Sequence, residues 1–273
     1  MTFDKVIMNP PYPTQNCSMP IHIELMSMAQ KASNVVISLA PTGFMQDPVW
    51  EFKRGHHRKR YSDFVNHIKN IEIFESKDAN DLFGTEFAVD IGIYNIDKET
   101  HTPPECYKDK WFCEHVIKRI ASDKALGLNN YFEKKPSTEY FCSVPKIHGH
   151  HARADEYDAY DVFSVKKSVV RGMSKGNSAE YVSFKTEEEA ENFRKSMMMP
   201  FIKYINYNAK RGLTNFFPVI PYMGDYSKIW TDSDYAEYFN VPDKKMKAIE
   251  AMVEKWNKTA TKYYLDGLKE SIG

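Results

Sequence analysis

The sequence predicts an α/β fold, in which a mainly parallel, helix-covered sheet is followed by an α+β region. In the first hundred residues, continuous apolar runs typical of buried strands alternate with a helical pattern. The later residues are rich in aromatic side chains and turns. A hydrophobic content of 42% and a charged content of 27% are ordinary for a globular protein and exclude a disordered or fibrous chain.

The first region is expected to contain four strands and one helix. Lys5 to Met8 is a short apolar run that two prolines end, so the residues after it lie in a loop at the carboxyl end of a strand. Residues 21–31 have apolar side chains at helical spacing. The other strands are expected at residues 34–40, 68–74 and 88–94.

The composition changes after about residue 98, where a polar stretch with two prolines is typical of a linker. We therefore expect one domain over residues 1–100 and a second over residues 101–273. Thr186 is expected to cap a helix over residues 187–205, because three acidic residues follow it. Further helices are expected at residues 111–122, 231–239 and 243–256, with short strands within 136–183 and irregular chain at 214–222.

Asn9-Pro10-Pro11-Tyr12 is the most informative feature of the sequence. An aromatic amine is a weak nucleophile, because its lone pair is delocalised into the ring. Two acceptors aimed at the amine hydrogens, the Asn9 side-chain carbonyl and the Pro10 main-chain carbonyl, would localise that lone pair. The consecutive prolines hold both acceptors rigidly. Tyr12 offers a flat face on which a flipped-out base can stack, a contact worth about 1–3 kcal/mol.

Residues 3–12 (Phe-Asp-Lys-Val-Ile-Met-Asn-Pro-Pro-Tyr) resemble the catalytic motif of adenine-N6 DNA methyltransferases. Glu180 to Ile205 resembles a segment of the target-recognition region in the methylases of type II restriction–modification systems. Pro218 to Met252 resembles their C-terminal signature. Protein-glutamine methyltransferases also carry Asn-Pro-Pro-Tyr, but the long C-terminal region favours DNA as the substrate.

The resemblance implies a partial Rossmann-like methyltransferase sheet over residues 1–100 and a target-recognition region over residues 101–273. The implied reaction transfers a methyl group from S-adenosylmethionine to the amino nitrogen of an adenine flipped out of DNA. The catalytic residues would be Asn9, Pro10, Pro11 and Tyr12.

The resemblance also implies an aromatic residue that stacks on the flipped base near the last strand of the sheet. Phe87 and Tyr94 are the candidates, and packing in the core is the alternative for both. Residues 41–44 follow the second strand, so they are expected near Asn9 at the edge of the sheet.

The sequence departs from this family at the cofactor site. These enzymes bind S-adenosylmethionine at a glycine-rich turn after the first strand, yet only eight residues precede Asn9. Residues 172–176 and 223–225 contain the remaining glycine candidates, and neither stretch follows a clean strand with Gly-x-Gly spacing. The chain is therefore expected to be the C-terminal part of an enzyme whose cofactor half is supplied by a partner chain or is missing. The cofactor-binding residues remain unassigned.

A net charge of zero means that a nucleic-acid partner must be held by a local basic patch. Residues 53–60 form the densest basic run, and residues 166–175 form a weaker one. A solvated surface is the alternative for both. The candidates for contact with DNA phosphates are Lys53, Arg54, Arg58, Lys59, Arg60, Lys166, Lys167 and Arg171.

Other chemistries have little support in the sequence. Four cysteines without regular spacing indicate a reduced, cytoplasmic setting rather than a disulfide framework. The histidines of residues 148–151 have no carboxylate or cysteine at ligand spacing, so no metal site is expected. No apolar run reaches about 18 residues, so no membrane-spanning helix is expected.

Two other functions remain open: a non-catalytic DNA- or partner-binding remnant of such an enzyme, and a methyltransferase that acts on protein or RNA. A sheet that stops in the middle of a parallel array exposes an edge strand and an apolar face. The chain is therefore expected to pair with a second chain that supplies the cofactor half, to form a homodimer, or to be poorly soluble.

Overall fold

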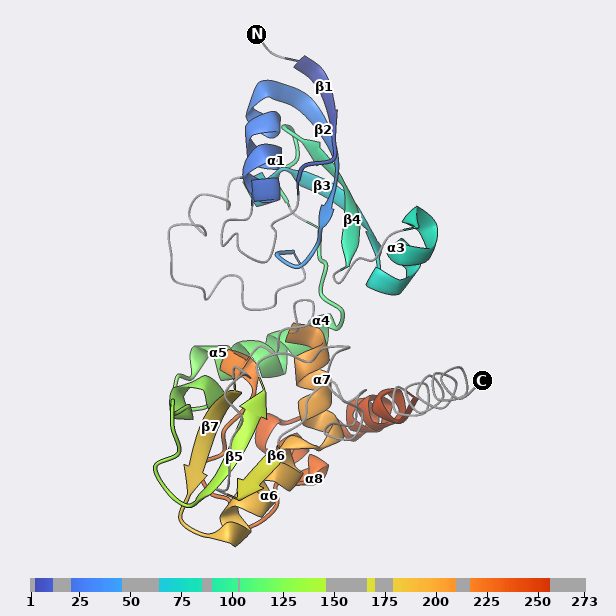
Figure 1. Cartoon of the computed structure of the whole chain (residues 1–273). Coiled ribbons are helices and arrows are strands. Elements are labelled where there is room, and N and C mark those ends of the chain that lie inside the picture. Colours follow the sequence, from blue (N-terminus) through green and yellow to red (C-terminus); the bar gives the residue numbers. More distant parts are fainter. Residues whose placement is uncertain are drawn as a thin grey trace, which may run out of the picture. The chain divides into compact units, whose positions relative to one another are not determined.

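The computed structural model of the chain divides into two compact units, Met1–Lys110 and Trp111–Gly273 (Figure 1). The boundary between the units lies ten residues after the position expected from the polar, proline-containing stretch. The structure describes residues 3–11, 21–45, 64–84, 90–102, 104–145, 166–169, 179–209 and 217–255.

Unit 1 is built on a mixed four-stranded sheet with the strand order β1-β2-β4-β3. Strands β1 and β2 are parallel, whereas β4 is antiparallel to both of its neighbours. The elements of this unit are β1 (Phe3–Met8), α1 (Ile21–Ala32), β2 (Ser33–Pro41), β3 (Ile68–Phe74), α3 (Ser76–Phe83) and β4 (Ile91–Asp97).

The expectation of a mainly parallel sheet is wrong for two of the three strand pairings. Strands β1, β2 and β3 all run in one direction, but β4 runs in the opposite direction and is inserted between β2 and β3. Strand β4 therefore separates β2 from β3, which run parallel to each other but are not hydrogen-bonded. Apolar composition alone does not reveal this, because a buried strand has the same pattern in either direction.

One face of this sheet carries the core of unit 1. Along each strand, side chains alternate between the two faces. Val36, Ala40 and Tyr94 point to the face on which α1 packs through Ile23 and Met26, and all five side chains are almost fully buried. Helix α1 confirms the helix predicted at residues 21–31. That prediction was based on apolar residues that recur at helical spacing.

The other face of the sheet and the outer edge of β1 are more exposed. Among the described residues, β1 pairs only with β2. Phe3 is 52% exposed and Ile7 is 76% exposed. On the same face, Val35, Ile37 and Leu39 of β2 are only half-buried. The apolar run of β2 is thus covered on one side and partly open on the other.

Unit 2 contains a three-stranded antiparallel sheet with the order β6-β5-β7, together with several helices. A continuous helical segment, made of α4 (Lys110–Phe112), the π-helix Cys113–Ile117 and α5 (Lys118–Ser122), confirms the helix predicted at residues 111–122. The other elements are a 3-10 turn at Leu128–Tyr131, β5 (Tyr140–Pro145), β6 (Lys166–Val169), β7 (Ala179–Phe184), α6 (Glu187–Met197), α7 (Pro200–Ala209), a 3-10 turn at Phe217–Val219, α8 (Asp232–Phe239) and a helix at residues 243–255.

The helix predicted over residues 187–205 is in fact two helices. Thr186 caps α6 as expected: its hydroxyl accepts from the Glu189 N–H, and the Glu189 carboxylate accepts from the Thr186 N–H. Helix α6 ends at Met197, and α7 begins at Pro200. Proline cannot donate a backbone hydrogen bond within a helix, so it is favoured at the start of a new one.

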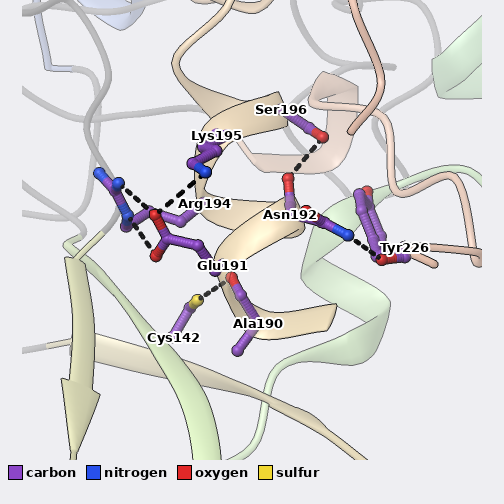
Figure 2. Close-up of polar contacts among 8 residues, drawn as sticks. All are labelled: Cys142, Ala190, Glu191, Asn192, Arg194, Lys195, Ser196 and Tyr226. Carbon is purple, nitrogen blue, oxygen red and sulfur yellow. Dashed lines mark hydrogen bonds and ion pairs between the residues drawn. The ribbon is translucent and has the colours of Figure 1, made fainter. Parts of the chain in front are cut away.

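Helix α6 fixes the loop that leads into α8 (Figure 2). The Asn192 side-chain amide donates to the Tyr226 carbonyl at 3.0 Å, as Figure 2 shows. The Ser196 hydroxyl accepts from the Trp230 N–H at 2.8 Å. Arg194 binds the Glu191 carboxylate through two nitrogens, at 3.0 and 2.7 Å. The loop between Tyr226 and Trp230 is therefore held in a defined conformation.

Candidate functional site

Asn9, Pro10 and Pro11 directly follow β1, at the carboxyl end of the parallel β1–β2 pair. The Asn9 side chain is exposed, whereas Pro10 is buried. The loop therefore combines a buried proline with an asparagine that is exposed to solvent. Ligands of α/β sheets bind outside the carboxyl ends of the strands, so the sequence motif has the position that a binding loop needs. Tyr12 lies outside the described residues.

The segment after β2 lies at the same edge of the sheet. Met8 pairs with Ser38, and β2 continues for three more residues, so Thr42 and Gly43 follow β2 beyond the level of Asn9. The Thr42 N–H and hydroxyl donate to the Asp90 carbonyl at 3.0 and 3.2 Å. Pro41 is thus the last residue of β2, and Thr42, Gly43 and Phe44 follow the strand at the carboxyl end of the β1–β2 pair.

Tyr94 lies in the core instead of lining an open pocket. Its side chain has no exposed surface, its ring stacks on Phe44 with a centroid distance of 5.7 Å, and its hydroxyl donates to the Pro41 carbonyl at 2.8 Å. These contacts agree with core packing, the alternative to stacking on a flipped base. Phe87, the other stacking candidate, lies outside the described residues.

His22 is a polar residue near this edge that the sequence reasoning missed. It is the second residue of α1 and is 6% exposed, and its ring centroid lies 6.3 Å from that of Phe44. Burial lowers the pKa of His22 to about 4, so the imidazole is neutral at physiological pH. The sequence signal that could have identified His22 is its position at the start of the helix that follows the Asn-Pro-Pro-Tyr motif.

Among the described residues of unit 1, two buried polar atoms have no hydrogen-bond partner, His22 Nδ1 and Ser38 Oγ. Ser38 pairs with Met8 across the parallel ladder and with Tyr94 across the antiparallel one. Both polar atoms therefore lie on the face of the sheet that α1 covers, near the end of β1 that leads into Asn9. An unmade buried hydrogen bond costs about 1–3 kcal/mol.

The basic runs proposed for DNA phosphates are largely outside the described residues. This applies to the candidates of residues 53–60 and to Arg171. Lys166 and Lys167 form the start of β6 and pair with Ser143 and Cys142 on β5.

The described glycines do not form a Gly-x-Gly turn after a strand. Gly224 has a φ of 80° and lies in the loop before α8, not after a strand. Gly43 follows β2 but has no second glycine two residues away. The stretch at residues 172–176 lies outside the described ranges. The described residues therefore do not fit S-adenosylmethionine by themselves.

The described cysteines give no sign of nucleophilic or metal chemistry. Burial raises the pKa of the Cys106 thiol to about 11, which keeps it protonated at neutral pH. Cys113 and Cys142 are buried, and the Cys142 thiol donates to the Ala190 carbonyl at 3.2 Å (Figure 2). Across the described ranges, no group of three histidine, cysteine or carboxylate side chains is placed to hold a metal ion. Nor does any helix in those ranges have the length and apolarity needed to span a bilayer.

No protein-family model, curated protein or solved structure matches this chain. A function for it must therefore be inferred from its own residues and geometry.

Proposed function

We propose that this chain is the C-terminal part of an adenine-N6 DNA methyltransferase. The observation that carries the proposal is the placement of Asn9 and Pro10. They directly follow a parallel strand, with the Asn9 side chain exposed and Pro10 buried. That placement suits a rigid loop that presents acceptors to a ligand at the carboxyl edge of the sheet.

In this proposal the chain binds the target base and orients its amino group. The adenine amine has two N–H groups. One donates to the Asn9 amide oxygen, and the other donates to the Pro10 carbonyl oxygen. This draws the nitrogen toward a tetrahedral shape and makes its lone pair available. Pro11 stiffens the loop, and Tyr12 stacks on the flipped base. S-adenosylmethionine is the methyl donor that the resemblance implies, and its site would belong to another half of the enzyme.

The open side of the sheet supports a missing half. The outer edge of β1 has no strand partner among the described residues, and Phe3 and Ile7 expose apolar surface beside it. The adjacent face of β2 is apolar and half-buried. Parallel strands are usually covered on both faces, so these features suit a sheet that continues in a cofactor-binding half.

A non-catalytic remnant that binds DNA or a partner protein is the alternative. The lack of a glycine turn after any described strand favours it. The two proposals differ in whether the Asn9 amide has a chemical role, and a remnant can bind a partner protein in place of DNA.

The first test is a calorimetric titration of the purified chain with S-adenosylmethionine, alone and with a short adenine-containing duplex. We expect binding of the duplex and no binding of the cofactor to the chain alone. Cofactor binding to the chain alone would show that the chain has its own cofactor site. The chain would then be a complete methyltransferase. Failure to bind the duplex under any condition would contradict the methyltransferase proposal and leave only a remnant that binds a partner protein.

The second test removes the Asn9 amide. The chain is combined with a candidate cofactor half from a neighbouring reading frame, and transfer of labelled methyl to the duplex is measured. Asn9→Ala should reduce the rate at least about 100-fold, as loss of a positioned polar group in a catalytic site does, with little change in duplex affinity. Asn70→Ala, at an exposed position of β3, is the control. Equal rates for the two variants would exclude the catalytic role of Asn9.

A further inference from the structure

Unit 2 carries a connected surface row of aromatic and cationic side chains, here called the aromatic–cationic strip. Its members come from the helical segment at residues 110–122, from the loop fixed by α6 and from α8. Its residues are Trp111, His115, Arg119, Tyr238, Trp230 and Lys228. None of them is among the residues that the sequence singled out for nucleic-acid contact.

The first half of the strip lies along one helical segment. Trp111, His115 and Arg119 are spaced four residues apart, which places them on neighbouring turns of one side. The Trp111 and His115 rings stack with a centroid distance of 4.6 Å and an interplanar angle of 9°. Both His115 and Arg119 are exposed.

The second half of the strip joins this helix to α8. The Arg119 guanidinium lies 5.1 Å from the centroid of the Tyr238 ring, and its Nη1 donates to the Tyr238 carbonyl at 3.0 Å. The Tyr238 ring, 37% exposed, meets Trp230 edge to face at 6.1 Å. The Lys228 ammonium lies 5.0 Å from the Trp230 ring.

The charge of Arg119 is available to an external anion. In the part of the chain that the structure describes, Arg119 contacts aromatic rings and one carbonyl but no carboxylate. A guanidinium has five N–H donors in a fixed plane, so most of them remain open here. Lys228 differs, because the Asp234 carboxylate neutralises it at 2.5 Å. The strip thus combines one preorganised, unneutralised cation with several flat rings.

We propose that the aromatic–cationic strip binds an unpaired segment of a nucleic-acid strand, with Arg119 on a phosphate and the exposed rings on bases. Charge complementarity supports an anionic partner, and the flat rings favour one with planar bases. Proteins that bind single strands combine these two features, cations along the backbone and aromatic faces for stacking. Among the described residues, cations at the strip are few: Arg119, Lys228 and, 5.9 Å from the Trp111 ring, Lys245. So few cations suit a short strand segment better than a long duplex, which is held by many phosphate contacts. The inference extends the proposed function, because a methyltransferase that flips a base must handle unpaired nucleotides.

The test measures the affinity of the full chain for a fluorescently labelled single-stranded DNA of about 20 nucleotides at several salt concentrations. Arg119→Gln should weaken binding about 10-fold and reduce the slope of log affinity against log salt by about 0.7, the value for one phosphate contact on a single strand. Tyr238→Leu should weaken binding by a similar factor with the slope unchanged, since stacking releases no counterions. Lys135→Gln, at an exposed position in the loop before β5, is the charge-matched control.

The outcomes separate the strip from the proposed function. Unchanged affinity in both Arg119→Gln and Tyr238→Leu, or equal losses in the Lys135→Gln control, would overturn the inference. So would equally tight binding of a poly-glutamate peptide, which would assign the strip to an acidic protein partner. If single-strand binding depends on the strip but the reconstituted pair transfers no methyl group, the proposed catalytic function fails and the strip remains a nucleic-acid site.

Discussion

At the scale of single residues, Gly92 shows how closely unit 1 is packed near the candidate site. A methyl group at this position of β4 would lie 2.5 Å from the Thr42 Cγ2 atom and 2.7 Å from the Ile71 Cγ2 atom. Both are far shorter than normal contacts, so the sheet would have to shift. Glycine at this position lets the Thr42 segment approach β4.

Gly92→Ala should therefore destabilise unit 1 by about 1–3 kcal/mol, as overpacking of a core does. Urea unfolding followed by circular dichroism measures the change. Gly43→Ala is the matched control, because a methyl group there meets no atom within 4 Å. A Gly92→Ala variant as stable as Gly43→Ala would mean that Thr42 and Ile71 can move aside at little cost.

His22 gives a second prediction at this scale, a loss of stability in acid. Its pKa in the folded chain is about 4, below the unfolded value of 6.5. Between these values the unfolded chain binds the additional proton, so the free energy of unfolding falls as the pH falls from 6.5 to 4. The loss should be about 3 kcal/mol.

Unfolding curves at pH 7, 5.5 and 4 test this prediction. His22→Leu should flatten the part of the pH dependence that His22 causes, while His101→Leu, at an exposed position, should leave it unchanged. The same pH dependence in His22→Leu and in the wild-type chain would assign the acid sensitivity to other groups.

At the scale of elements, the capping box of α6 is the clearest local signal in unit 2. Thr186→Ala removes the hydroxyl that accepts from the Glu189 N–H, so the free energy of unfolding should fall by about 1 kcal/mol. Thr186→Ser retains the hydroxyl and should recover most of that loss. Thermal unfolding of the three proteins measures the difference, and equal losses in the two variants would rule out the cap as the cause.

Elements with a local cause could be predicted from the sequence. The Thr186 cap and helix α1 follow from side-chain spacing and hydrogen bonding within a few residues, and both are confirmed. The break before Pro200 could have been predicted from the same rules. The direction and insertion of β4 could not, because they depend on pairings between strands about 20 to 60 residues apart in the chain.

The candidate site divides in the same way. The position of Asn9 after a strand was predictable, because the prolines that follow it end the strand. The burial of His22 and the contact between Arg119 and Tyr238 were not, since both depend on packing between segments distant in the sequence. The strip forms only when a helix at residues 110–122 and α8 pack together, so its rings meet across more than one hundred residues of chain.

At the scale of the whole molecule, the outer edge of β1 predicts association, because no other described strand pairs with it. An unpaired edge with exposed apolar side chains promotes pairing with another strand. We expect the isolated chain to self-associate at micromolar concentration in sedimentation velocity experiments. Ile7→Lys should reduce association, because a charge on an edge strand opposes pairing, and it should preserve the fold, because Ile7 is 76% exposed.

Met28→Lys is the control for this experiment, because Met28 is 64% exposed on α1 and away from the β1 edge ladder. A wild-type chain that stays monomeric throughout this range would contradict the prediction. Equal effects of the two lysine substitutions would assign association to general surface hydrophobicity instead of the edge.

The insertion of β4 between β2 and β3 also sets the order in which unit 1 can form during synthesis. Strands β2 and β3 are not neighbours, and each is hydrogen-bonded to β4, which is the last of the four to leave the ribosome. The β1–α1–β2 segment can form early, but β3 has no strand to pair with until residue 97 has emerged. A nascent chain that stops before this point should remain sensitive to protease, and it becomes resistant only when β4 completes the sheet.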